Sequence, residues 1–315
     1  MYLSICTGVY GDFSFAETLD KVKAHGLDYV EVCVGGWGPN PHGLASELIK
    51  DDAKLEEFKN ELAKRDMHIS ALNCSGNPLC PGEIGKKHSD TAYDTVTLAG
   101  KLGVKTVVMM SGLPAACPTD QTPNWITSTQ SLPCDKPYLI EAYRYQWEDV
   151  AIPWWKEFVK HCDANGVRIA IEEFPGQLVY NVSTFKKLRA AVGETVGINL
   201  DPSHLMAFGA DPIASARALK GMIYYVHGKD ARIERGLSDI DGIIDNSCVE
   251  DIETRTWNYV AVGCGHDLKW WKEFFSVLSM GGYKGVVALE MEDLTMSVEA
   301  GVTTSIEALE ATISK

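Results

Sequence analysis

The sequence lacks any long apolar run and any recognisable export signal. None of its apolar stretches approaches the roughly 20 residues that a membrane helix needs. The first residues, MYLSICTGVYGDF, have neither the charged region nor the apolar region of a secretory signal. These absences predict a cytoplasmic protein with no membrane partner.

Positive charge is also scarce. The 315 residues include 29 Lys and Arg against 43 Asp and Glu, which gives a formal net charge of -14. A chain of this charge repels the phosphates of nucleic acids and anionic lipid surfaces. We therefore expect a small-molecule partner and no nucleic acid.

Several local motifs are missing as well. The nine cysteines are odd in number and contain no CxxC pair, so neither a disulfide framework nor a thiolate zinc site is indicated. No GxGxxG follows the first apolar run, and no GxxxxGK[ST] occurs anywhere. Dinucleotide and P-loop nucleotide binding therefore lose their main support.

What the sequence does contain is a repeated unit of strand, polar loop and helix. With 45% hydrophobic and 23% charged residues, the composition is that of a globular protein. Short β-branched or apolar runs predict eight strands. These are residues 2–6, 29–34, 68–73, 106–110, 168–172, 196–201, 223–227 and 285–290.

Segments with helical spacing of apolar residues lie between these runs. The expected helices are residues 15–24, 53–64, 91–102, 143–164, 184–191, 213–219, 268–280 and 297–313. The phrases HGLDYVEV, LGVKTVVM, NGVRIAIE and GGYKGVVALE repeat one device, in which a glycine ends a helix just before the next strand. We predict an α/β protein, a single (β/α)8 TIM barrel over residues 1–315, with an open doubly wound sheet as the alternative.

Two connections are unusually long. Residues 111–140 follow the fourth strand and residues 228–267 follow the seventh, and both contain aromatic residues. Barrel enzymes build their active sites at this end of the strands. We expect these loops to be ordered lids or interface segments, the alternative being disordered insertions.

Ligand-type side chains stand at the ends of four successive strands. These are Glu172, Asp201, His227 and Glu290. Adjacent barrel strands lie about 4.8 Å apart, so the four tips can converge on one point at the barrel mouth. Three carboxylates and one imidazole crowded together would repel one another without a cation. The pattern therefore predicts a site for one divalent metal ion.

The donor set also narrows the choice of metal. Oxygen-rich ligation with a single nitrogen suits Mn²⁺, Mg²⁺ or Co²⁺ better than a structural zinc site. We expect Mn²⁺ first and keep Zn²⁺ as an alternative. Such an ion would polarise a substrate oxygen.

The same segments resemble a known family. VRIAIE, GINLDPSHL, YVHGKDAR and GVVALEMED are similar to the last four strands of the xylose isomerase-like barrels, the sugar phosphate isomerase/epimerase superfamily. The resemblance spans the whole chain, and LDPSHL followed by HGKDAR is its most specific part. It implies that Glu172, Asp201, His227 and Glu290 bind one metal ion. It further implies that Glu172 and Glu290 transfer protons on opposite faces of a ketose.

Other side chains are candidates for the substrate. His204 follows Asp201 by three residues and is expected to point back towards the metal as a catalytic or substrate contact. Arg232 offers a fork of donors for substrate oxygens, and Trp37 an aromatic face for a sugar. His266 lies beside two glycines and is a further substrate candidate. The alternatives are a backbone-bonded histidine at 204 and a surface ion pair at 232.

Two positions depart from the family pattern. Many relatives have a histidine where this chain has Phe174, and the ketose epimerases have a second glutamate where it has Leu178. Those two substrate contacts therefore do not transfer directly to this chain.

Together these features predict a metal-dependent isomerase or epimerase of a sugar or keto-sugar. It would act by removing a proton next to a metal-polarised carbonyl. The alternative is a lyase that eliminates the aglycone from a 3-oxo-glycoside, as in C-glycoside deglycosidase catalytic subunits. A homo-oligomer would fit the first activity and a small partner subunit the second. A DNA endonuclease on the same barrel is opposed by the acidic charge.

Overall fold

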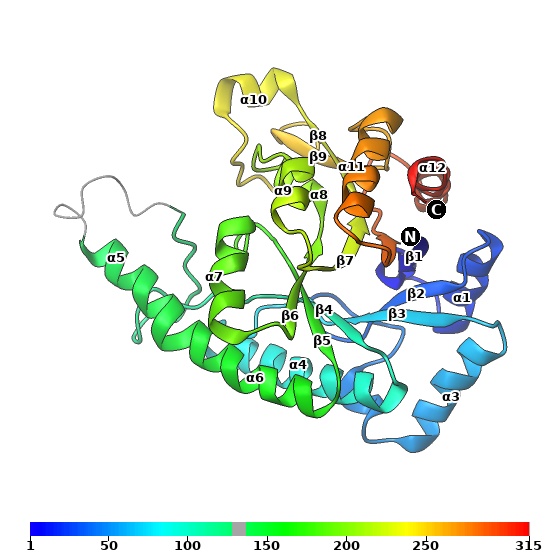
Figure 1. Ribbon diagram of the computed structural model, residues 1–315, viewed down its shortest axis with the longest axis horizontal. Coiled ribbons are helices and arrows are strands. Elements are labelled where there is room, and N and C mark those ends of the chain that lie inside the picture. The colour runs from blue at the N-terminus through cyan, green and yellow to red at the C-terminus, as the bar shows by residue number, and fades with distance from the viewer. Residues whose placement is uncertain (128–136, 315) are drawn as a thin grey trace.

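The protein is a closed parallel barrel surrounded by helices (Figure 1). The computed structural model describes residues 1–127 and 137–314. Around the barrel the strand order is β1-β10-β7-β6-β5-β4-β3-β2. The strands are β1 Tyr2–Cys6, β2 Tyr29–Cys33, β3 His68–Asn73, β4 Thr106–Met110, β5 Arg168–Glu172, β6 Val196–Leu200, β7 Ile223–Gly228 and β10 Val286–Leu289. The predicted (β/α)8 fold is confirmed, and each strand end lies within one residue of its expected place.

Helices cover the outside of this barrel. The main ones are α1 Phe15–Ala24, α3 Asp52–Ala63, α4 Gly82–Leu102, α6 Ile152–Ala164, α7 Val182–Val192, α9 Pro212–Ala218, α11 Leu268–Met280 and α12 Val298–Thr312. Polar side chains start several of them; Ser14, for example, forms a reciprocal capping box with Glu17. Among the described residues, no helix has the length and apolarity to cross a membrane.

One helix begins earlier than the sequence indicates. The prediction started α4 at residue 91, whereas the structure starts it at Gly82. The segment GEIGKKHSD that opens this helix has two glycines and four charged residues, so it gives little apolar periodicity. Its buried His88 accepts a hydrogen bond from the Asn77 amide at 3.0 Å, which fixes this turn against the preceding loop.

Side chains alternate between the two faces of each barrel strand. In β5, Ile169 and Ile171 pack in the core between strands and helices, whereas Ala170 belongs to a smaller cluster of strand residues in the barrel interior. Glu172 has the same parity as Ala170 and therefore points inward. The same alternation places His227 on the same face of β7 as Tyr225, which lies in the barrel interior.

The long connection after β4 is only partly described. Residues 128–136 of the expected loop lie outside the described residues. The chain then forms α5 Pro137–Arg144, a π-helical segment Tyr145–Ala151 and α6, which run on from one another. In Figure 1 these three form one long element on the outside of the barrel. Gln146 fastens it to the described part of the loop by donating to the carbonyls of Pro114 and Asn124.

The connection after β7 carries its own secondary structure. It contains β8 Asp230–Ile233, α10 Arg235–Asp241 and β9 Trp257–Val260, and β8 pairs antiparallel with β9. Figure 1 shows this unit projecting beyond the end of β7. The expectation of an ordered segment matches these elements, although its strands were not predicted.

Asp230 anchors this connection to the barrel. The carboxylate is fully buried and accepts six hydrogen bonds from N–H donors at 2.9–3.3 Å. The donors are the backbone amides of Ala231, Gly263, Gly265 and His266 and the rings of His266 and Trp271. Gly265 is required here because a Cβ would meet the Ala231 carbonyl oxygen at 2.4 Å. The start and the end of the connection are therefore held by one carboxylate.

Candidate metal centre

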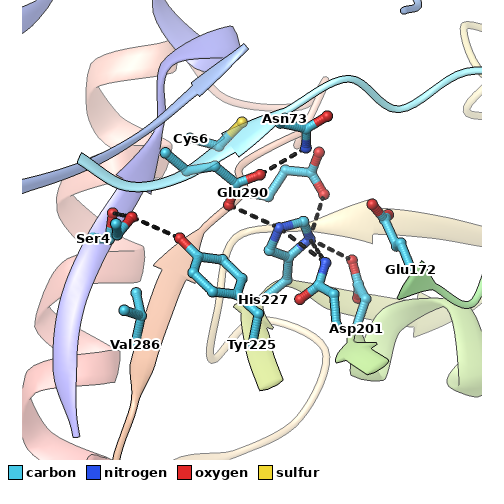
Figure 2. A network of polar contacts seen from close by, with 12 residues as sticks. Ser4, Cys6, Asn73, Glu172, Asp201, Tyr225, His227, Val286 and Glu290 are labelled. Atoms are coloured by element: carbon cyan, nitrogen blue, oxygen red, sulfur yellow. Dashed lines mark hydrogen bonds and ion pairs between the residues drawn. The ribbon is translucent and has the colours of Figure 1, made fainter. Parts of the chain in front are cut away.

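The four predicted ligands come together at the barrel mouth. Glu172 ends β5, Asp201 follows β6, His227 lies in β7 and Glu290 follows β10. One ligand atom from each lies within 4.8 Å of the others. Figure 2 shows His227 between Asp201 and Glu290. Glu172, Asp201 and His227 are buried, and the Glu290 side chain is 21% exposed.

The hydrogen bonding of the two Asp201 carboxylate oxygens indicates whether a cation fits the cluster. Its Oδ1 accepts hydrogen bonds from the amide and the hydroxyl of Ser203, at 2.8 and 2.7 Å. Its Oδ2 is buried and accepts no hydrogen bond from the described residues, with ring nitrogens of His204 and His227 at 3.3 and 3.5 Å. A buried carboxylate oxygen without a donor is costly. The cluster offers three carboxylates and one imidazole as ligands, and it can therefore hold a divalent metal ion.

Neighbouring charges set the ionisation of these carboxylates. Burial alone would raise the pKa of Asp201, but His204, His227 and Lys229 lower it to about 2. Burial likewise opposes ionisation of Glu290, yet Lys229 and His227 hold the pKa of this carboxyl well below its usual range. Glu172 differs, because burial raises its pKa despite the hydrogen bond to His204. Two of the three carboxylates are thus held as anions and the third is biased towards the protonated form.

His204 lies inside the cluster, on the short helix α8 Pro202–Met206. Its Nε2 is 2.9 Å from Glu172 Oε1 and 3.3 Å from Asp201 Oδ2. Its Nδ1 lies 3.0 Å from the hydroxyl of Tyr259, which comes from β9. The histidine therefore links two ligand carboxylates to the connection after β7.

Lys229 is a buried cation beside the site. The ammonium lies 2.8 Å from Glu290 Oε2 and 2.7 Å from Glu292 Oε2, and it sits over the Tyr259 ring at 4.2 Å. Lys229 does not form an ion pair with the adjacent Asp230. Its ion-pair partners are Glu290 and Glu292, whereas Asp230 accepts hydrogen bonds from the six N–H donors described above.

A cavity of about 550 Å³ adjoins the cluster. Glu172, Glu290 and Lys229 are among the residues that line it. The loops after β1 and β2 form much of the remaining wall, where the Trp37 side chain stands 50% exposed. The position of Trp37 is that of a residue able to stack on a bound molecule.

Two of the proposed substrate contacts lie elsewhere. Arg232 is not on the wall of this cavity and pairs with Glu234 at 2.7 Å. His266 is also off the wall and donates to Asp230, with Nδ1 and Oδ1 2.9 Å apart. The structure gives both residues partners in the connection after β7. It does not bring them to the cluster.

The sequence matches a known family over nearly its whole length. The family model described as xylose isomerase-like TIM barrel covers residues 19–312. The chain belongs to this family. A relative from Bacillus subtilis (strain 168), the uncharacterized protein YfiH, is 56% identical over 316 residues, which is 100% of both chains.

Solved structures of the family share the fold at low identity. The probable 3-DHS dehydratase AsbF of Bacillus anthracis superposes with a TM-score of 0.67 at 15% identity, covering 98% of this chain and 99% of that one. The D-psicose 3-epimerase of Clostridium cellulolyticum H10 gives 0.62 at 16%, covering 99% and 98%. A Mycobacterium smegmatis protein of the family, solved in complex with magnesium, gives 0.63 at 17%, covering 95% and 88%.

Phe174, where the resemblance implies a histidine, is part of the cavity wall. Its ring stands edge-on to His204 with the centroids 4.6 Å apart. This apolar ring packs against the histidine that holds Glu172. The wall is therefore apolar at this position.

Sequence reasoning missed several residues of the site. Glu31 comes from β2 and contacts His227 Nε2, and Asn73 comes from β3 and donates a hydrogen bond to Glu31. Tyr259 comes from a strand that was expected to be loop. A cue for Glu31 was present: a lone charge between Val30 and Val32 in an alternating strand must share the inward face with the strand-end ligands.

Proposed function

We propose that this protein is a divalent-metal-dependent isomerase or epimerase of a sugar or keto-sugar. The observation that supports this best is the position of Glu172 and Glu290. Both carboxylates line one cavity, and both contribute an oxygen to the same four-residue cluster. Two carboxyls beside one substrate pocket suit the removal and the return of a proton.

The metal would be held by Glu172, Asp201, His227 and Glu290. When bound, a divalent ion, Mn²⁺ in our proposal, acts as a Lewis acid towards a carbonyl and so makes the neighbouring C–H more acidic. Glu290, kept ionised by Lys229, accepts that proton. Glu172 returns a proton from Oε2, because its Oε1 is held by His204 at 2.9 Å.

The cavity wall supports a substrate without a phosphate group. Lys229 is the one Lys or Arg side chain on the wall within the described part of the chain, and two carboxylates already pair with it. A phosphate group would meet three nearby carboxylates and no unpaired Lys or Arg side chain on the described wall. We therefore propose a neutral sugar, with Trp37 stacking on one of its faces.

Isotope exchange tests this function. The purified protein, loaded with Mn²⁺, is incubated with a panel of ketoses in D₂O, and deuterium at the carbon next to the carbonyl is read by NMR. We expect incorporation with the wild type and its loss in Glu290→Gln and in Glu172→Gln. Glu234→Gln is the matched control, because Glu234 pairs with Arg232 away from the cavity. Conversion of a ketose without any deuterium uptake would reject the proton-transfer mechanism.

A lyase is the second candidate, and the apolar part of the cavity favours it. Trp37, Met110, Phe174, Val249 and Met291 line this part, which offers room for an apolar group beyond the sugar. In a 3-oxo-glycoside the same carboxylates would remove the proton at C2. The C1–O bond then breaks, a C1–C2 double bond forms and the aglycone leaves with the electron pair.

Two measurements separate the candidates. Release of a phenol from an aryl 3-oxo-glucoside, followed by absorbance, would support the lyase, and its absence alongside ketose exchange would support the isomerase. Purification of the native protein gives an independent result. A co-purifying small subunit favours the lyase, and a self-paired oligomer favours the isomerase.

A further inference from the structure

His227 has two ring nitrogens with different surroundings. Nδ1 faces the cluster, 3.5 Å from Asp201 Oδ2 and 3.4 Å from Glu290 Oε2. Nε2 faces the opposite way and lies 3.1 Å from Glu31 Oε2. Asn199 lies 3.2 Å from both nitrogens and so does not distinguish them. The carboxylate of Glu31 is thus the group that makes the two ends of the ring unequal.

Glu31 is itself held in place. It is fully buried, and its Oε1 accepts a hydrogen bond from Asn73 Nδ2 at 2.6 Å. Asn73 is fixed in turn, because its Oδ1 accepts from the Ser75 amide at 2.8 Å. Figure 2 shows Asn73 on the far side of His227 from Asp201. Within the described residues, His227 is the one ion-pair partner of Glu31.

A metal-bound imidazole must present a lone pair, so the other nitrogen must carry the hydrogen. In metal sites that hydrogen is commonly donated to a carboxylate outside the ligand set, which fixes the tautomer and the ring orientation. Glu31 stands at the position of such an acceptor. The Glu31 carboxylate has no hydrogen to donate. A His227 tautomer without a hydrogen on Nε2 would turn a lone pair towards the carboxylate oxygen, and this tautomer is therefore excluded.

We propose that Glu31 is a positioning residue for the metal centre: it accepts the Nε2–H of His227 and thereby directs the Nδ1 lone pair into the cluster, with Asn73 fixing the carboxylate. The inference rests on the proposed function in that it requires the cluster to bind a metal ion. It extends the site from four strand-end ligands to a support on β2 and β3. The barrel therefore contributes to the metal centre from both sides of His227.

Mn²⁺ titration of Glu31→Gln tests the proposal, with free Mn²⁺ read by electron paramagnetic resonance. We expect the affinity for the metal alone to fall about 10- to 100-fold. Asn73→Ser keeps the carboxylate but removes its donor, so a smaller loss is expected. Glu234→Gln should bind as the wild type does. Circular dichroism of each variant shows whether it has folded, and Asn73→Ser still tests the support if Glu31→Gln does not fold.

The second readout is the tautomer. In ¹⁵N-histidine-labelled protein loaded with diamagnetic Zn²⁺, the proposal expects a hydrogen on Nε2 of His227 in the wild type. This resonance should broaden or shift in Glu31→Gln, which a purely structural role would not require. Equal Mn²⁺ affinity and an unchanged tautomer in the folded variant would overturn the inference and leave the isomerase intact. Metal binding that depends on Glu31, without any substrate exchange, would reject the isomerase alone. A wild type that binds no divalent ion would overturn both.

Discussion

Replacing Asp230 by Asn should destabilise the protein far more than a typical polar substitution. The side chain keeps its shape, but one oxygen becomes an NH₂ group that cannot accept. Oδ1 accepts from the Ala231 amide and the His266 ring, and Oδ2 accepts from the three remaining amides and the Trp271 ring. Whichever way the amide turns, at least two N–H donors lose their acceptor, and at least one of them is fully buried.

The magnitude follows from those contacts. Each buried donor left without an acceptor costs about 1–3 kcal/mol, and the remaining bonds lose the strengthening that a charged acceptor gives. For two donors the sum is about 2–6 kcal/mol. We expect Asp230→Asn to lower the free energy of unfolding by about 4 kcal/mol, the middle of that range, because neighbouring effects overlap and do not add fully. This is a large share of the roughly 5–15 kcal/mol that stabilises a typical domain.

Urea unfolding followed by circular dichroism measures this change. Asp267→Asn serves as the control, because Asp267 is an exposed helix cap with a single bond to the Trp270 amide, and asparagine caps equally well. The control should stay within about 0.5 kcal/mol of the wild type. A loss below about 1 kcal/mol for Asp230→Asn would refute the idea that one carboxylate anchors the connection after β7.

Three further outcomes are expected. Mn²⁺ at about 100 times its dissociation constant should stabilise the wild type by about 2.7 kcal/mol, seen as a higher Tm; an equal rise in Asp201→Asn would speak against the assigned ligands. Burial lowers the pKa of the His42 imidazole, so the unfolded chain binds a proton more tightly than the folded protein does. The stability linked to this group is present above the unfolded pKa of about 6.5 and is lost as the pH falls through the folded pKa. His42→Gln should flatten urea midpoints over this range, and an unchanged slope would contradict the assignment. Trp37→Ala should leave unfolding within about 0.5 kcal/mol but raise KM for the sugar, since the side chain is half exposed; an unchanged KM would remove Trp37 from the binding wall.

The strands and the ligand set could be predicted because burial imposes simple patterns. A parallel barrel strand is apolar along its length and shows its functional residue where it ends, as in the run from Ile169 to Glu172. Glycines before the strands marked the boundaries. The four ligands were therefore identifiable from position alone, and the structure brings them together.

The supporting residues were harder to predict because each depends on a distant partner. Glu31 meets His227 across the barrel, 196 positions away in sequence. Arg232 and His266 found partners within the folded connection after β7, whose short antiparallel strands leave little periodicity in the sequence. Local patterns indicate which face a residue takes, and the pairing across the barrel then decides its role.

The end of β7 carries three tasks in four consecutive residues. His227 belongs to the metal cluster, Lys229 neutralises Glu290, and Asp230 anchors the connection. Since side chains alternate along a strand, a shift of one residue would turn each of them to the wrong side. Metal cluster, counter-charge and anchor would then fail together. Point substitutions in this short segment should therefore affect one role at a time, whereas an insertion or a deletion should disrupt all three together.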